Sequence, residues 1–146
     1  MKQLVFALQF TGTAGPAGEG KLHASTKAAG QALRASFGRG GIQAVLEPAA
    51  GDGATFESDV EIIGEGTFLE SGTITYGSAG SVTFKTVGHG ILGPSPMKDL
   101  QFGAVTWQVV SGQGSLAGAT GYITSNFTVG AQGEVVDNQF AVLFVP

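Results

Sequence analysis

The chain has 146 residues, of which 25 are glycine and none is cysteine, and only 12% are charged. This length fits a single domain over residues 1–146, because domain sizes peak at about 100–150 residues. Glycine costs about 1 kcal/mol at each interior position of a helix, so its abundance excludes a mainly helical fold. A hydrophobic fraction of 42% argues against disorder. A β fold with many tight turns remains.

The charged residues are few and scattered. Seven basic and 11 acidic residues give a net charge of −4, and the basic ones form no run, so we expect no nucleic-acid partner. The absence of cysteine excludes disulfides and thiolate ligands and fits the reducing cytoplasm. The apolar run Leu4–Leu8 is too short for a secretion signal, and no run reaches the roughly 18 residues of a membrane-spanning helix. We therefore expect an unprocessed cytoplasmic protein with no membrane span.

Polar and apolar residues alternate along most of the chain, which is the pattern of strands with one buried face. In chain order the alternation predicts strands near residues 4–10, 21–28, 42–46, 56–62, 66–77, 82–86, 102–110, 122–129 and 134–145. From residue 54 onward, short glycine-containing turns separate these strands. The sequence therefore predicts an antiparallel meander over this part of the chain.

Two segments depart from the alternation. Residues 26–34 are rich in alanine, but Gly30 lies among them and no clear cap precedes them, so we favour a strand or irregular structure over a helix. Residues 89–100 contain Pro94 and Pro96, and proline is excluded from central strands because it cannot donate a ladder hydrogen bond. We predict a long loop there, at one end of the sheet.

The number of expected strands is enough to close a barrel, and closure removes edges that a chain with so few charges could hardly protect. The predicted fold class is all-β, an eight- or nine-stranded antiparallel closed barrel that is lipocalin-like in shape. Such a barrel either fills its interior with side chains or holds one small ligand. The last strand is apolar on both faces from Phe140 to Val145, which favours a homo-oligomer, a dimer or a trimer.

The segment Trp107–Val129 reads as a strand, a glycine-rich turn and a second strand. The turn has the pattern Gly-x-Gly-x-Leu-x-Gly-x-x-Gly, at Gly112, Gly114, Leu116, Gly118 and Gly121. This hairpin resembles the late hairpin of the allene oxide cyclase-like and dirigent-like barrels, and the resemblance covers roughly residues 54–146. The chain resembles a bacterial-type member of that superfamily.

The resemblance implies a small barrel with an apolar pocket, often trimeric, that uses no metal and no organic cofactor. Members of the superfamily include cyclases of unsaturated fatty-acid epoxides, proteins that steer phenoxy-radical coupling, and bacterial cyclases of natural-product pathways. The resemblance transfers no catalytic residue to this chain. The candidate site therefore rests on the residues themselves.

Glu70 is the best single candidate for chemistry, because strand parity places it with Phe68, Ile74 and Tyr76 on an apolar face. A carboxyl group in an apolar pocket has a raised pKa and can transfer a proton. The alternative is a bulge near Gly72 that would turn Glu70 out to solvent. Tyr76 would either hydrogen-bond a ligand carbonyl or end its strand as a core residue.

The two histidines are the only side chains with an ordinary pKa near neutrality. His89 opens the predicted loop at the barrel mouth, whereas His23 lies among lysines on what reads as a solvated face. Because they lie in separate segments, we expect no metal site. Glu57, Asp59 and Glu61 alternate on one strand; a solvent-facing row is the favoured interpretation, and a cation site or an acid–base pair is the alternative.

The first two function hypotheses share one interior pocket. The expected catalytic residues are Glu70, Tyr76 and His89, and the expected pocket residues are Phe68, Phe84, Trp107 and Tyr122. The first hypothesis is a cofactor-free isomerase or cyclase acting on a hydrophobic small molecule. The alternative is a non-catalytic, lipocalin-like carrier of such a molecule, and a third is an assembly module with a solid core.

Overall fold

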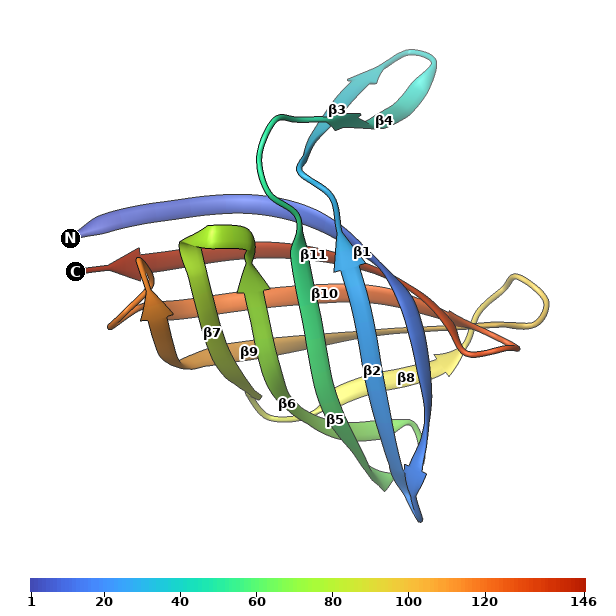
Figure 1. Ribbon diagram of the computed structural model, residues 1–146. Helices are drawn as coiled ribbons and strands as arrows, with labels where there is room; N and C mark the ends of the chain where they lie inside the picture. Colours follow the sequence, from blue (N-terminus) through green and yellow to red (C-terminus); the bar gives the residue numbers. More distant parts are fainter.

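A computed structural model describes all 146 residues, and they form strands joined mainly by tight turns (Figure 1). The strands are β1 (Lys2–Gly18), β2 (Lys21–Ala28), β3 (Gln31–Gly38), β4 (Gly41–Pro48), β5 (Ala54–Gly64), β6 (Thr67–Tyr76), β7 (Gly80–Thr86), β8 (Gly90–Pro94), β9 (Leu100–Gly114), β10 (Thr120–Gly130) and β11 (Glu134–Val145). The one helical segment is the 3-10 helix η1 (Gly77–Ala79). No helix is long and apolar enough to cross a membrane.

Eight of these strands close into an antiparallel barrel, in the order β1-β2-β5-β6-β7-β9-β10-β11. Closure comes from the pairing of β11 with β1, which runs unbroken from Lys2↔Val145 to Thr13↔Glu134. Strand β8 is an additional short strand between β6 and β9. The predicted fold class and the predicted meander are therefore confirmed.

Strands β7 and β8 share one position in the barrel wall. The long strand β9 pairs with β7 through its C-terminal half and with β8 through its N-terminal half. The predicted loop over residues 89–100 is therefore wrong for Gly90–Pro94, a short strand that pairs with β6 at Gly90 and Ile91 and with β9 from Ile91 to Pro94. Pro94 is tolerated because it is the last residue of β8, where its missing N–H interrupts no further pairing.

The alternation of exposed and buried side chains follows the sequence pattern. On β5, Phe56 and Ser58 are buried while Glu57 and Asp59 face solvent. Strand β6 runs past β5 without a bulge from Phe68 to Tyr76. A Cβ at Gly72 would overlap the backbone oxygen of Glu57, so glycine allows the close approach of the two strands that keeps this register unbroken.

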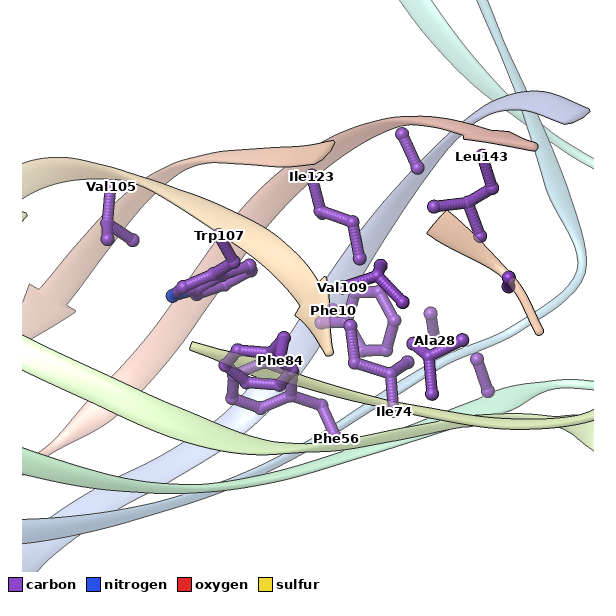
Figure 2. Close-up of a cluster of buried hydrophobic side chains, with 14 of the residues drawn as sticks. Phe10, Ala28, Phe56, Ile74, Phe84, Val105, Trp107, Val109, Ile123 and Leu143 are labelled. Atoms are coloured by element: carbon purple, nitrogen blue, oxygen red, sulfur yellow. The ribbon is translucent and has the colours of Figure 1, made fainter. Parts of the chain in front are cut away.

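Aromatic side chains fill one part of the barrel (Figure 2). The rings of Phe84 and Trp107 lie 4.6 Å apart, those of Phe56 and Phe84 5.3 Å, and those of Phe10 and Phe56 6.0 Å. All four side chains are at most 2% exposed. Burial of such side chains is the main stabilising contribution to a barrel of this size.

Strands β3 and β4 form a separate two-stranded sheet that projects from the barrel between β2 and β5 (Figure 1). We call this hairpin the arm; it spans Gln31–Pro48. The sequence pattern predicts a strand at 42–46 as part of the barrel, but that segment lies in the arm instead. Its partner β3 overlaps the end of the alanine-rich segment 26–34, for which the sequence favours a strand or irregular structure, so this strand is predicted only in part.

Candidate active site inside the barrel

Glu70 is buried in the barrel interior, with only 8% of its surface exposed. Ser58 on β5 donates a hydrogen bond of 2.6 Å to its Oε1, and Nε1 of Trp107 on β9 donates one of 3.2 Å to its Oε2. Both donors face inward because strand parity places Ser58 with Phe56, and Trp107 with its buried neighbours on β9. The side chain is therefore held from two sides.

The backbone of Glu70 lies opposite the break between β7 and β8. Ladder pairing on that side of β6 ends at Ser71↔Lys85 and resumes at Phe68↔Gly90. The hydroxyl of Thr86 bridges the gap, because it accepts a 2.7 Å hydrogen bond from the Glu70 N–H and donates one of 2.8 Å to the Glu70 carbonyl. One threonine thus replaces two ladder hydrogen bonds at the candidate residue.

A second buried carboxyl group, Asp137 on β11, is only 5% exposed. Ser125 on β10 donates a 2.5 Å hydrogen bond to its Oδ1, and Nε2 of Gln139 donates one of 2.8 Å to its Oδ2. Asp137 is not among the candidate residues predicted from the sequence. The signal was present, because parity from the buried Leu143 back along β11 places Asp137 on the same inward face.

Burial raises the pKa of both carboxyl groups. Loss of solvation raises the pKa of Glu70 to about 7. The hydrogen bonds from Ser58 and Trp107 lower this pKa, whereas the charge of Asp137 raises it further. Loss of solvation likewise raises the pKa of Asp137 to about 6, although the hydrogen bonds of Ser125 and Gln139 lower it. Two acids that titrate close to neutrality therefore share one interior.

Both carboxyl groups line a cavity of about 70 Å³, and 12 of its 16 lining residues are hydrophobic. Leu22, Ile62 and Val129 border it next to the β1–β2, β5–β6 and β10–β11 turns, so its mouth lies at that end of the barrel. Thr26 also lines it, and the buried hydroxyl of Thr26 has no hydrogen-bond partner. A larger groove of about 540 Å³ lies over β2, β5, β6 and the end of β7, and Glu70 also borders it. Four charged side chains of the outer surface line this groove: Lys21, Asp59, Glu61 and Lys85.

The structure brings together some of the predicted pocket residues. Phe68 and Trp107 line the cavity beside Glu70. Phe84 packs against Trp107 in the aromatic core and does not border the cavity. Tyr122 is 54% exposed on the outer surface, because the inward face of β10 carries Ile123 and the residues in register with it. Tyr122 therefore cannot line this cavity.

Tyr76 and His89 lie apart from Glu70. Tyr76 is six residues along β6, about 20 Å at the rise of a strand, where its ring packs edge-on against Phe6 at 5.1 Å. Burial raises the pKa of Tyr76 well above its ordinary value, and its hydroxyl has no hydrogen-bond partner. His89 is exposed and borders a shallow outer groove with Val87.

His23 and the row of carboxylates lie on the outside of the barrel. The His23 ring bridges two acids across the β2–β5 pairing, at 2.7 Å from Glu57 Oε2 and 3.0 Å from Asp59 Oδ1. Hydrogen bonds to Asp59 and Glu57 raise the pKa of His23, and a hydrogen bond from Ser25 lowers the pKa of Glu57. These side chains are largely exposed, so the predicted solvent-facing row is confirmed.

Comparison with known proteins adds no relative. No protein-family model, no curated protein and no solved structure matches the chain. The turn from Gly112 to Gly121 does connect two paired strands, β9 and β10, as the sequence pattern predicts. The resemblance to the allene oxide cyclase-like and dirigent-like barrels stays a prediction.

Proposed function

We propose that the barrel is a cofactor-free isomerase or cyclase in which Asp137 and Glu70 transfer protons to and from a small apolar molecule. The observation that carries the proposal is the pair of buried carboxyl groups lining one mainly apolar cavity. Acid–base catalysis is most effective when the pKa of the catalytic group lies near the working pH. The pKa values of about 7 for Glu70 and about 6 for Asp137 meet that condition.

The two groups suit complementary roles. Burial raises the pKa of both groups toward neutrality, and the charge of Asp137 further raises the pKa of Glu70, so Glu70 can hold a proton while Asp137 is ionised. Asp137 can then take a proton from one carbon of the substrate while Glu70 gives a proton to another, which moves a double bond or closes a ring. Atoms and electrons balance without an oxidant, a reductant or a second substrate. A pair with separated pKa values is a recurrent acid–base arrangement.

The size of the cavity restricts the substrate. Its volume of about 70 Å³ is well below the roughly 300–1,000 Å³ of sites that enclose a drug-sized molecule. Only a small molecule, or the narrow reacting end of a longer one, fits between the two acids. The Thr26 hydroxyl, which has no partner within the protein, supplies a hydrogen bond for one polar atom of that end.

The test uses 4-penten-2-one, a narrow open-chain ketone whose double bond moves into conjugation when a proton is removed from one carbon and returned to another. We expect the protein to accelerate this isomerisation at least tenfold over buffer, followed by ultraviolet absorbance, with a maximum between pH 6 and 7. Glu70→Gln and Asp137→Asn should each remove most of the acceleration. Glu57→Gln, a matched change on the outer face of the barrel, should not alter it.

An absence of acceleration by the unmodified protein, or full activity in Glu70→Gln, would overturn the acid–base proposal. A carrier is the second candidate, and one observation favours it. All four carboxyl oxygens of the two acids already accept hydrogen bonds from the barrel wall, as they would in a static polar lining. Under that alternative, 2-pentanone shifts the NMR signals of Phe68 and Phe127 at the cavity, while no variant or condition produces turnover.

A further inference from the structure

The arm is amphipathic. Its register pairs Leu33 with Leu46, Ala35 with Ala44 and Phe37 with Ile42, and directly opposed residues of an antiparallel pair share one face. The opposite face carries the Arg34–Glu47 ion pair, at 2.9 Å, and the polar Ser36 and Gln43, with Ala32 and Val45 as its two apolar members. One side of the arm is therefore continuously apolar and the other is mainly polar.

The apolar face of the arm is open to solvent. Phe37 is 78% exposed, Ile42 74% and Leu33 52%. At the base of the arm, the Ala49 N–H donates to the Gly30 carbonyl and joins its two connecting segments, and the Gln31 side chain donates to the Gln9 carbonyl of the barrel. A two-stranded hairpin is marginally stable in water, so a cover for this face would stabilise the arm as well as bury its side chains.

A second apolar surface lies on the barrel beside the arm. The outer faces of β1, β11 and β10 form what we call the uncharged wall, whose apolar members are Val5, Ala7, Tyr122, Phe140, Val142 and Phe144. No charged residue occurs in the segments 3–9, 120–126 and 138–144 that build it. Aromatic enrichment with few charges is the composition of an interface core.

Charge on the barrel is concentrated on the other side. The outer faces of β2 and β5 carry Lys21, Lys27, Glu57, Asp59 and Glu61 together with His23. The uncharged wall is therefore a distinct surface rather than part of a uniformly uncharged barrel. Exposed apolar patches of this kind mark interaction sites.

We propose that the arm is an exchange element between two copies of this chain, with the apolar face of each arm packed on the uncharged wall of its partner. The two surfaces match in chemistry, since neither presents a charge to the other. They also lie close together in the molecule, because Gln31 at the base of the arm bonds to Gln9 of β1. Figure 1 shows the arm pointing away from its own barrel, so it covers nothing within its own chain.

Buried area favours a second copy over an unrelated partner. Each arm strand has 8 residues, so the arm is about 26 Å long and about 10 Å wide, a footprint of roughly 260 Å². One arm on one foreign surface buries about 500 Å² in total, too little for a stable complex. A reciprocal exchange doubles this to at least about 1,000 Å², which approaches the range of stable interfaces.

The test is sedimentation velocity of the full chain at micromolar concentration. We expect a dimer for the unmodified protein and a monomer with an unchanged circular dichroism spectrum for Phe37→Asp, whose side chain lies outside the barrel. Ser36→Asp places the same charge on the polar face of the arm and should remain dimeric. Phe140→Lys, on the uncharged wall, should also be monomeric.

A mixture of the two monomeric variants distinguishes exchange from simple loss of an apolar surface. When Phe37→Asp is mixed with Phe140→Lys, one arm–wall contact is intact and the other joins opposite charges, so a heterodimer should form. A monomeric unmodified protein at 100 μM, or no heterodimer in the mixture, would overturn the proposal. Binding of the monomer to phosphatidylcholine vesicles, lost in Phe37→Asp, would also overturn it and assign the arm to a lipid surface.

Discussion

At the scale of single residues, Glu70 and Asp137 show how a strand pattern can carry chemistry into a core. Each acid accepts a hydrogen bond from a serine on the adjacent strand, Ser58 for Glu70 and Ser125 for Asp137. In both cases the serine lies diagonally across the pairing, two residues along the neighbouring strand from the residue directly opposite the acid. The hydrogen bonds favour the charged form, but the loss of solvation outweighs them.

The raised pKa values predict that stability falls as pH rises. The folded protein holds the two protons up to pKa values of about 7 and about 6, whereas the ordinary values are 4.5 and 3.8. Between about pH 4 and pH 7 the folded state therefore binds more protons than the unfolded state, and the free energy of unfolding declines. The shift of Glu70 alone corresponds to about 3 kcal/mol.

Urea unfolding at pH 5 and pH 8 measures this effect. Glu70→Gln should reduce the difference between the two pH values and raise stability at pH 8, because the amide is neutral. Its oxygen can accept from Trp107 while its amino group donates to Ser58, whose hydroxyl can also act as an acceptor. Equal pH dependence in Glu70→Gln and the unmodified protein would show that Glu70 is ionised in the fold at an ordinary pKa.

At the scale of elements, the sequence pattern predicted most of the strands and the inward face of β6. Alternation specifies which residues share a face, so it correctly grouped Glu70 with Phe68. It cannot say which face is inside where both carry large side chains, as with Tyr122 and Ile123 on β10. Nor does the alternation predict that β6 and β11 border one cavity, because their proximity depends on closure of the whole barrel.

The broken strand gives a prediction at this scale. Thr86→Val removes the hydroxyl that satisfies both the N–H and the carbonyl of Glu70, and an unsatisfied buried group costs about 1–3 kcal/mol. We expect a loss of that size in urea unfolding and faster hydrogen exchange of the Glu70 amide. Thr86→Ser retains the hydroxyl and is the matched control, expected within about 1 kcal/mol of the unmodified protein. Equal stability of the valine and serine variants would mean that water replaces the hydroxyl.

At the scale of the whole molecule, the barrel has two ends of different character. The aromatic core occupies one part of the interior, and the mouth of the cavity lies at the β1–β2, β5–β6 and β10–β11 turns. The arm leaves the barrel between β2 and β5 at the end of β2 that carries Ala28, away from the β1–β2 turn. Association through the arm and the uncharged wall would therefore leave the cavity mouth open to a ligand.

The same substitution at two positions of β2 tests whether the cavity is a site or a packing defect. Ala24 lines the cavity, whereas Ala28, on the same inward face, lies in the core away from it. Because empty volume costs about 24 cal/mol per Å³, filling about 70 Å³ with Ala24→Leu should stabilise the protein by about 1–2 kcal/mol. Ala28→Leu should destabilise it by about 1–3 kcal/mol through overpacking.

The two variants separate function from stability when 4-penten-2-one turnover is measured beside urea unfolding. Ala24→Leu should lose turnover while gaining stability, because the added side chain occupies the space between Glu70 and Asp137. Ala28→Leu should keep turnover at a temperature where it remains folded. Full turnover in Ala24→Leu would place the reaction outside this cavity, since no route to both buried acids remains once its volume is filled.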